Sequence, residues 1–288
     1  MTISGKSKVY GVIGDPIGHS LSPAIQNAAF EASKLNCVFL AFRVKSEEVS
    51  KALDGIRALG IQGLNVTMPH KKAVISFLDE VDQNAKLLNA VNTIKNDNGK
   101  LYGLNTDGVG ALEALRENGV EPKGKKVTLL GAGGAARAIA FALAKEANEL
   151  SIVNRTLQSA AELADLLHQR FNSKVVAYTL SPLAIKATVA EADLLINASS
   201  IGMKPNVNLT PVKRRWLKKD LAVMDIVYNP TETKLAKDAK ALGAKVITGV
   251  EMLIYQGAAS FEFWTGCKAP VEVMRKAALS HLRRAQKG

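Results

Sequence analysis

Residues 131–156 read GAGGAARAIAFALAKEANELSIVNRT, and this stretch decides the fold class. A short apolar run precedes it, an alanine-rich helical pattern fills its middle, and a second apolar run ends it. The order strand, glycine loop, helix, strand is typical of a βαβ unit that binds a dinucleotide. In such a loop Gly131 permits the tight turn, Gly133 lets the backbone approach a pyrophosphate, and Ala136 allows close packing of the helix. The alternative is a glycine turn in an ordinary βαβ unit.

The end of the same stretch indicates which dinucleotide is bound. An NAD-binding unit carries an acidic residue about 20 residues after the loop, where it binds the ribose 2′-hydroxyl. Here that place reads Asn154-Arg155-Thr156, without an acid. An arginine pairs with a 2′-phosphate and stacks on adenine. The pattern therefore predicts NADP, and the alternative for Arg155 is a solvated loop residue.

The rest of the chain alternates short apolar runs with amphipathic helical patterns, which predicts an α/β fold with mostly parallel sheets. The first series of expected strands covers residues 8–13, 38–44, 63–67, 90–95 and 101–104, with helices at 23–35, 46–59 and 107–118. The second series covers strands 126–130, 150–153, 175–178, 193–197 and 222–227, with helices between them. From residue 249 to the end the pattern is helical.

Bulk properties exclude several classes of protein. A length of 288 residues predicts about two domains, and 47% hydrophobic residues exclude a disordered chain. The net charge is +12, but basic residues cluster only at 213–219 and at Arg283-Arg284, and aromatic residues make up only 5%. We therefore expect a solvated basic surface that attracts anionic small molecules, and no nucleic-acid partner.

The cysteines and the apolar runs indicate the compartment. Cys37 and Cys267 have no CxxC or Cys/His spacing, so neither a disulfide framework nor a metal site is expected. No apolar run reaches the roughly 20 residues of a membrane span, and the N-terminus lacks a signal-peptide pattern. These observations predict a cytoplasmic protein without a membrane association.

Four polar clusters fall at expected strand ends or helix starts in the first part of the chain. Ligands of open α/β sheets bind outside the carboxyl ends of the strands, so the clusters could share one cleft. Their hydroxyls, amides, lysine and carboxylate suit a small, polyhydroxylated, anionic molecule. The clusters are SLSP at 20–23, NVTMPHK at 65–71, NAVNT at 89–93 and NTDG at 105–108.

Each cluster also has a simpler interpretation. Ser22 could be the N-cap of a helix that begins at Pro23, Thr67 or Met68 could cap one that begins at Pro69, and Asp107 could cap the helix that follows it. Capping does not explain Lys71, because a cation in the first turn of a helix faces the positive end of the dipole. We therefore expect a carboxylate near Lys71.

Taken together, these motifs resemble the shikimate/quinate dehydrogenase family. The motifs SLSP, NVTMPHK, NAVNT, NTDG, GAGGAAR, NRT, DIVYNP and YQGA stand in that family's order and spacing over nearly the whole chain. The resemblance implies two α/β domains with the active site in the cleft between them. It implies a discontinuous substrate domain, 1–107 plus 250–288, and a Rossmann-type NADP domain, 108–249.

The resemblance also implies an activity: the reversible, NADP-dependent reduction of 3-dehydroshikimate to shikimate in aromatic amino acid biosynthesis. Lys71 and Asp107 would be the catalytic pair. The residues implied for the substrate are Ser20, Ser22, Thr67, Asn92, Asp107, Tyr228 and Gln256. Those implied for the cofactor are Gly131, Ala132, Gly133, Gly134, Ala135, Asn154, Arg155, Thr156, Ile226 and Gly249.

Two departures from the family pattern concern the cofactor. Ser159 stands where many members carry a second arginine, and Gln83 stands where some carry a carboxylate. A broader quinate/shikimate dehydrogenase and a non-catalytic NADP-sensing relative remain as alternatives. The second would be expected to lose Lys71 or Asp107, and both are present. The chain is expected to be a monomer or a homodimer.

Overall fold

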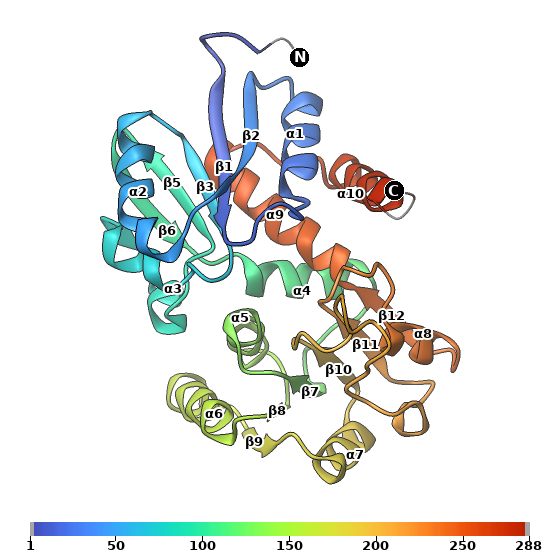
Figure 1. Cartoon of the computed structure of the whole chain (residues 1–288). Helices are drawn as coiled ribbons and strands as arrows, with labels where there is room; N and C mark the ends of the chain where they lie inside the picture. The colour runs from blue at the N-terminus through green and yellow to red at the C-terminus, as the bar shows by residue number, and fades with distance from the viewer. Residues whose placement is uncertain (1–2, 286–288) are drawn as a thin grey trace. The chain divides into compact units, whose positions relative to one another are not determined.

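The computed structural model describes residues 3–285 and divides into two compact units (Figure 1). The first combines the chain up to Thr106 with the segment from Ile254 onward, and the second runs from Asp107 to Leu253. Each unit is built on a six-stranded sheet with helices. The predicted α/β class is therefore confirmed.

The boundaries differ slightly from the expected breaks after residues 107 and 249. Asp107 belongs to the second unit because it is the first residue of α4 (Asp107–Glu117), which packs on α5 (Gly134–Leu143). Residues 250–253 belong there too, because they form the first turn of α9 (Gly249–Thr265) directly after strand β12 (Lys245–Thr248). The second boundary thus falls inside a helix.

The sheet of the first unit is mostly parallel. Its strand order is β2 (Cys37–Arg43), β1 (Lys8–Gly14), β3 (Gly63–Val66), β5 (Thr93–Asp97), β6 (Lys100–Leu104) and β4 (Glu80–Val81). Strand β5 runs antiparallel to both of its neighbours. The β5–β6 pairing follows from the two-residue turn Asn98-Gly99, in which both φ angles are positive, as a tight hairpin requires.

The helices of the first unit include a pair far apart in sequence. Helices α1 (Ser22–Ala32) and α10 (Val271–Ala285) lie side by side (Figure 1). The remaining helices are α2 (Val49–Ala58), α3 (Gln83–Leu88), the part of α9 from Ile254, and the 3-10 helices Ser46–Glu48 and Ala73–Phe77. The short elements β4 and α3 were not expected from the sequence, because neither shows a repeating apolar pattern.

Aromatic side chains from both ends of the chain form the core of the first unit. Tyr10 of β1 lies 5.1 Å from Phe30 and 5.3 Å from Trp264 between ring centroids, and Phe30 lies 5.5 Å from Phe261. The indole Nε1 of Trp264 donates to the carbonyl of Ile94 in β5, at 2.9 Å. Burial raises the pKa of Tyr10 to about 12, so its phenol stays protonated. Helix α9 therefore completes this core.

The free edge of the same sheet is partly covered by a side chain. At edge strand β2, the Asn27 amide accepts from the N–H of Phe39 at 2.8 Å and donates to its carbonyl at 2.9 Å. One side chain thus supplies the two hydrogen bonds that a further strand would make at this residue.

The second unit is a doubly wound sheet. All strand pairs are parallel, in the order β12, β11 (Ala222–Asp225), β10 (Leu194–Asn197), β7 (Lys126–Leu130), β8 (Glu149–Asn154) and β9 (Val175–Thr179). Helices α4, α5, α6 (Leu157–Phe171), α7 (Pro182–Glu191) and α8 (Lys234–Lys240) and the 3-10 helix Arg214–Trp216 accompany it. Strand β12 was not expected, because a half-exposed edge strand of four residues carries little apolar signal.

The order of these strands fixes where a ligand can bind. From β7 the chain passes to β8 on one side, and later returns to β10 on the other side of β7. The crevice at the carboxyl ends of β7 and β10 is therefore the switch point, where doubly wound sheets bind their ligands.

We expect the indole hydrogen bond to contribute measurably to the first unit. Trp264→Phe should lower the free energy of unfolding by about 1–3 kcal/mol, because it removes a buried donor from Ile94 and leaves space beside Tyr10. Urea unfolding monitored by circular dichroism measures the change. Trp216→Phe, at a half-buried tryptophan outside this core, is the control and should change the stability less. Equal effects of the two variants would contradict the structural importance of Trp264.

Candidate active site

The residues of the four polar clusters that belong to the first unit, those up to Thr106, are carried by segments next to one edge of its sheet. Ile13 pairs with Val66 at the carboxyl ends of β1 and β3, so the loops after these strands begin side by side. Because β5 is antiparallel, its first residue, Thr93, pairs with both Asn65 and Leu104. The segments that contain Ser20, Thr67, Asn92 and Asn105 therefore all meet this edge.

The segment 67–71 after β3 is held by backbone hydrogen bonds, one within it and two to neighbouring segments. The N–H of Thr67 donates to Ile13, the N–H of His70 donates to Thr67, and the carbonyl of Lys71 accepts from Val91 at 2.8 Å. His70 is buried, and its Nε2 donates to the carbonyl of Val44 at 2.7 Å, since a carbonyl can only accept. These bonds fix the half-buried Lys71 next to the segment that carries Asn92.

One expectation about Lys71 is wrong. No helix begins at Pro69: residues 68–72 are turns, and only a 3-10 helix, Ala73–Phe77, follows. The structure therefore places no helix dipole against the charge of Lys71. A proline can start a tight turn as readily as a helix, and the sequence pattern does not separate the two.

The structure also corrects the capping role of Ser22. Helix α1 begins at Ser22 itself, with Leu21 at the N-cap and no side-chain capping bond. Instead, the hydroxyl of Ser20 accepts weakly from the N–H of Ser22, at 3.3 Å. Ser22, which is buried, is the first residue of α1, and the half-buried Ser20 stands two residues before it, so both lie at a helix N-terminus, where anions are stabilised.

Asn92 is the centre of a buried polar network. Its Oδ1 accepts from the N–H of Thr106 at 2.8 Å, and its Nδ2 donates to the Thr106 hydroxyl at 3.0 Å. The hydroxyl of Thr93 bonds both Asn92 Oδ1 and the Ser260 hydroxyl. Ser260 Oγ donates in turn to the carbonyl of Gln256 on α9. The network thus fixes the side chain of Asn92 and links it to α9 and to Thr106, the residue that precedes Asp107.

Two further residues implied for the substrate belong to the second unit. Asp107, the first residue of α4, is 5% exposed. Tyr228 lies three residues beyond β11, and burial raises the pKa of its phenol above the ordinary value. The phenol therefore stays protonated near neutral pH and can donate a hydrogen bond.

The glycine loop forms a cradle at the switch point of the second sheet. Gly131 has a φ of +113°, and a Cβ there would lie 2.8 Å from the carbonyl oxygen of Ala198, so only glycine fits. Gly133 caps α5 in an extended conformation, and space is open where its Cβ would be. The first turn of α5 has no acidic residue, so its N–H groups favour an anion.

Residues 154–156 lie at the end of β8, beside this loop. Arg155 is exposed and lines the same cavity of about 290 Å³ as Gly131, Ala132, Gly133 and Asn154. Asn154 Nδ2 donates to the carbonyl of Thr156 at 3.0 Å, and the hydroxyl of Thr156 makes no capping bond to α6. The volume of this cavity is close to that of the smallest typical ligand pockets, which is about 300 Å³. The cavity is therefore large enough for one part of a dinucleotide.

These residues fit NADP by their chemistry. The cradle joins a helix N-terminus without acids to an exposed arginine, as a pyrophosphate and a 2′-phosphate require. Ile226 and Gly249 also come together, because a Cβ on Gly249 would lie 2.3 Å from the carbonyl oxygen of Ile226. Gly134 and Ala135 are the first two residues of α5.

Sequence reasoning missed one wall of the cradle. The loop after β10 lines the cavity, and its place beside β7 follows only from the strand order. The sequence did contain an indication of this loop, because the small polar pair Ser199-Ser200 closely follows an apolar strand. The cavity residues not anticipated are Leu130, Val153, Leu180, Ala198, Ser199, Ser200, Ile201 and Pro211.

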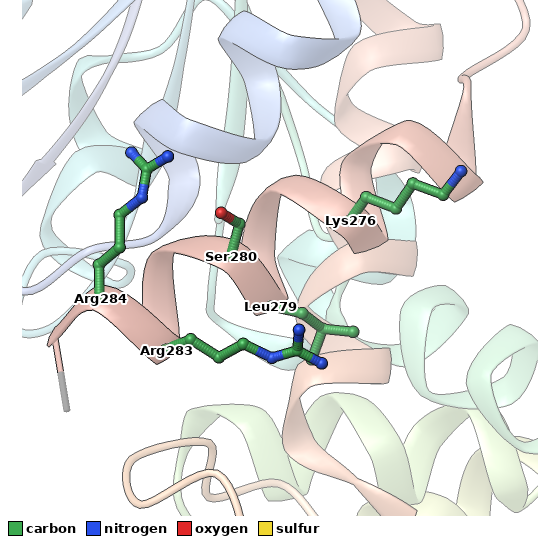
Figure 2. Close-up of a pocket in the computed structure, with 5 residues that line it drawn as sticks. All are labelled: Lys276, Leu279, Ser280, Arg283 and Arg284. Carbon is green, nitrogen blue, oxygen red and sulfur yellow. The ribbon is translucent and has the colours of Figure 1, made fainter. Parts of the chain in front are cut away.

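A second hollow lies along α10, far in the sequence from the residues that line the cradle. Figure 2 shows its five side chains, Lys276, Leu279, Ser280, Arg283 and Arg284, all from this one helix. Arg283 and Arg284 occupy the last turn, where cations are favourable to the helix dipole. The basic pair noted in the sequence therefore stands where it favours the helix.

Two further features of residues 3–285 bear on metal binding and on membrane spans. Three or more His, Cys, Asp or Glu side chains grouped as in a metal site do not occur there. None of the helices in that range combines the length and the apolar character that a membrane span needs.

The fold and the cradle define a Rossmann-type dinucleotide-binding protein with an added α/β unit. Three family models match: the "Shikimate dehydrogenase substrate binding domain" at residues 12–94, "Shikimate / quinate 5-dehydrogenase" at 113–237 and the "Shikimate 5'-dehydrogenase C-terminal domain" at 249–279. The chain belongs to the shikimate dehydrogenase family, as its motifs indicated.

Individual relatives are similar over almost the whole chain. The shikimate dehydrogenase (NADP(+)) of Methanopyrus kandleri is 49% identical, covering 98% of this chain and 99% of its own. A crystal structure of a shikimate dehydrogenase with NADP+ has a TM-score of 0.91 at 45% identity, covering 98% of each chain. The Thermus thermophilus enzyme in complex with NADP(H) and shikimate has a TM-score of 0.86 at 36% identity, covering 95% of this chain and 99% of its own.

A pair of glycine variants separates the structural part of the cradle from its ligand-binding part. Gly131→Ala should lower the free energy of unfolding by about 1–3 kcal/mol, because its φ is positive and Ala198 blocks the new Cβ. Gly133→Ala should leave stability nearly unchanged, since space is open there, but should weaken NADPH binding. Chemical unfolding and NADPH fluorescence titration measure the two effects. A loss of stability in Gly133→Ala as large as in Gly131→Ala would contradict this assignment.

Proposed function

We propose that this chain is an NADP-dependent shikimate dehydrogenase, which reversibly reduces 3-dehydroshikimate to shikimate for aromatic amino acid biosynthesis. The observation that carries the proposal is the 49% identity, over 98% of the chain, with a relative of that name. The Arg155 cradle supports it independently, because its chemistry suits NADP rather than NAD.

The proposed substrate is a small anion with several hydroxyl groups. Ser20 and Ser22, at the first turn of α1, would bind its carboxylate. Thr67, Asn92 and Gln256 would bind ring hydroxyls, and the protonated phenol of Tyr228 would donate a further hydrogen bond. The network around Asn92 supports this assignment, because side chains that are held in place lose less entropy when they bind a ligand.

The proposed chemistry is a hydride transfer coupled to a proton transfer. Gly131–Ala135 and Asn154–Thr156 would hold the cofactor, beside Ile226 and Gly249, and the cofactor when bound supplies or accepts the hydride. Lys71 would donate a proton to the ketone oxygen in the reduction and accept it from the hydroxyl in the oxidation. Asp107 would orient Lys71 and a neighbouring hydroxyl of the substrate. No metal takes part in this proposal.

The finer properties of the protein follow the same line. We propose a cytoplasmic monomer or homodimer whose partner is its small-molecule substrate. The net charge of +12 would favour encounters between the protein surface and this anionic substrate. We propose no nucleic-acid partner.

The proposal is tested by assaying the purified chain with shikimate and quinate, each with NADP+ and NAD+. Formation of reduced cofactor should be fastest with shikimate and NADP+. A kcat/KM for quinate equal to that for shikimate would indicate the broader quinate/shikimate enzyme. Binding of NADPH without turnover of either acid would indicate the non-catalytic relative instead.

Arg155 should determine the preference for NADP. Arg155→Ala should lower kcat/KM for NADP+ about ten- to a hundred-fold, the usual effect of losing a hydrogen bond to a charged group. The kcat/KM for NAD+, which has no 2′-phosphate, should change little. Arg170→Ala, at an exposed arginine of the same unit that does not line the cavity, is the matched control. Equal losses with both cofactors would assign Arg155 to the fold rather than to the phosphate.

Lys71 should determine the rate of the chemical step. Lys71→Met should lower kcat by about 10²–10⁴-fold, the typical contribution of general acid–base catalysis. KM for shikimate should change much less, because other groups hold the ring. Lys72→Met, at the exposed neighbour in the same turn, is the control and should keep its activity. Single-turnover kinetics measures the hydride transfer itself, without the contribution of product release. A Lys71→Met protein with a normal single-turnover rate would exclude Lys71 from the mechanism.

A further inference from the structure

The last residue of β11, Asp225, is a buried carboxylate that the proposed chemistry does not use. It is 1% exposed and pairs in register with Asn197, the last residue of β10, which is fully buried. Both residues stand at the carboxyl edge of the second sheet, from which the loops toward the cofactor emerge. Asp225 opens the DIVYNP motif, in which only Ile226 and Tyr228 were implied to have roles.

The hydrogen bonds of this carboxylate come from neutral groups. Oδ1 accepts from Asn197 Nδ2 at 3.0 Å and from the N–H of Val227 at 3.1 Å, and Oδ2 accepts from the Thr233 hydroxyl at 2.6 Å. Burial raises the pKa of Asp225 to about 6, although these three bonds oppose the rise. A buried carboxylate with this environment costs stability that an apolar side chain would not. Its presence therefore points to a purpose other than stability.

The contacts of Asp225 join two loops. On one side, Asn197 Nδ2 also donates to the carbonyl of Ile201 at 3.2 Å, and its Oδ1 accepts from both the N–H and the hydroxyl of Ser199. The loop that these bonds fix is the wall of the cradle, 198–201, and its Ala198 carbonyl is the one that excludes a Cβ at Gly131.

On the other side, Asp225 fixes the loop after β11. The bond from Val227 orients the backbone between Ile226 and Tyr228, and the bond from Thr233 closes the loop eight residues later. Thr233 is also the N-cap of α8, where its hydroxyl accepts from the N–H of Ala236 at 3.2 Å. One carboxylate thus ties the start and the end of this loop to the cradle wall.

We propose that Asp225 is a positioning residue for the cofactor: its carboxylate holds the loops after β10 and β11 in the conformation that receives the dinucleotide. This inference rests on the proposed function in one respect, that the cradle binds NADP(H). Asp225 acts through Asn197, Val227 and Thr233, not on the reacting atoms. Without this carboxylate the two loops populate other conformations, and only a fraction of the molecules can bind the dinucleotide. The apparent dissociation constant for the dinucleotide then equals the intrinsic constant divided by that fraction.

The test compares Asp225→Asn with wild type and with two further variants. Asp225→Asn keeps the shape but places an amide N–H₂ among donors, and Thr233→Val removes the hydroxyl that bonds Oδ2. Thr128→Val is the matched control: it removes one buried hydroxyl bond in the same sheet, to the carbonyl of Thr188, away from both loops. For each protein, NADPH titration gives the dissociation constant, steady-state kinetics gives KM for NADP+ and for shikimate, and urea unfolding gives stability.

We expect Asp225→Asn to raise the NADPH dissociation constant and KM for NADP+ by about five-fold or more, with KM for shikimate within about two-fold of wild type. Thr233→Val should act in the same direction, and the double variant should be less than additive, because both variants remove the bond between Thr233 and Asp225. Thr128→Val should lose stability and keep its NADPH affinity. If Asp225→Asn does not fold, Thr233→Val alone carries the comparison with Thr128→Val.

Two results would overturn the inference. One is an unchanged NADPH dissociation constant in the folded Asp225 or Thr233 variants, and the other is an equal loss of affinity in Thr128→Val. Failure of the proposed function is recognised separately, because the wild-type chain would then not bind NADPH or not oxidise shikimate.

Discussion

Parallel strands can be joined only by crossovers, so their carboxyl ends, and the loops that leave them, collect at one edge of a sheet. Both units of this chain depend on that constraint. In the first it brings the loops after β1 and β3 together, and the antiparallel β5 starts at this same edge, so Asn92, which precedes β5, lies there too. In the second it brings the glycine loop after β7 beside the loop after β10, where Gly131 meets Ala198.

Polar groups at these edges are arranged by one another rather than by a hydrophobic contact. The Asn92 amide uses both of its polar atoms on Thr106, and Asn197 divides its amide between Asp225 and the loop 199–201. A buried hydrogen-bond network of this kind costs stability if any member is missing, but when complete it allows few conformations. A single geometry at the strand ends is what a hydride transfer and a phosphate cradle both need.

Sequence patterns predicted the elements whose residues carry their own signal. The strand, glycine loop and alanine-rich helix around Gly131 were confirmed as β7 and α5, since each has a distinct local pattern. The elements β4, α3 and β12 were missed because short, half-exposed segments lack a period. The alternative of a helix that begins at Pro69 was wrong, because proline suits a turn equally well. The partners of Asn92 and Asp225 are distant in sequence, and only tertiary structure reveals them.

The discontinuity of the first unit has a consequence for biosynthesis. A ribosome delivers residues 107–253, a contiguous unit, before it delivers Phe261 and Trp264, which the core around Tyr10 and Phe30 requires. The aromatic core of the first unit can therefore be completed only after the whole of the second unit has been translated. The shortest interval between synthesis of Tyr10 and Phe30 and arrival of their ring partners is thus set by the time needed to translate the inserted unit.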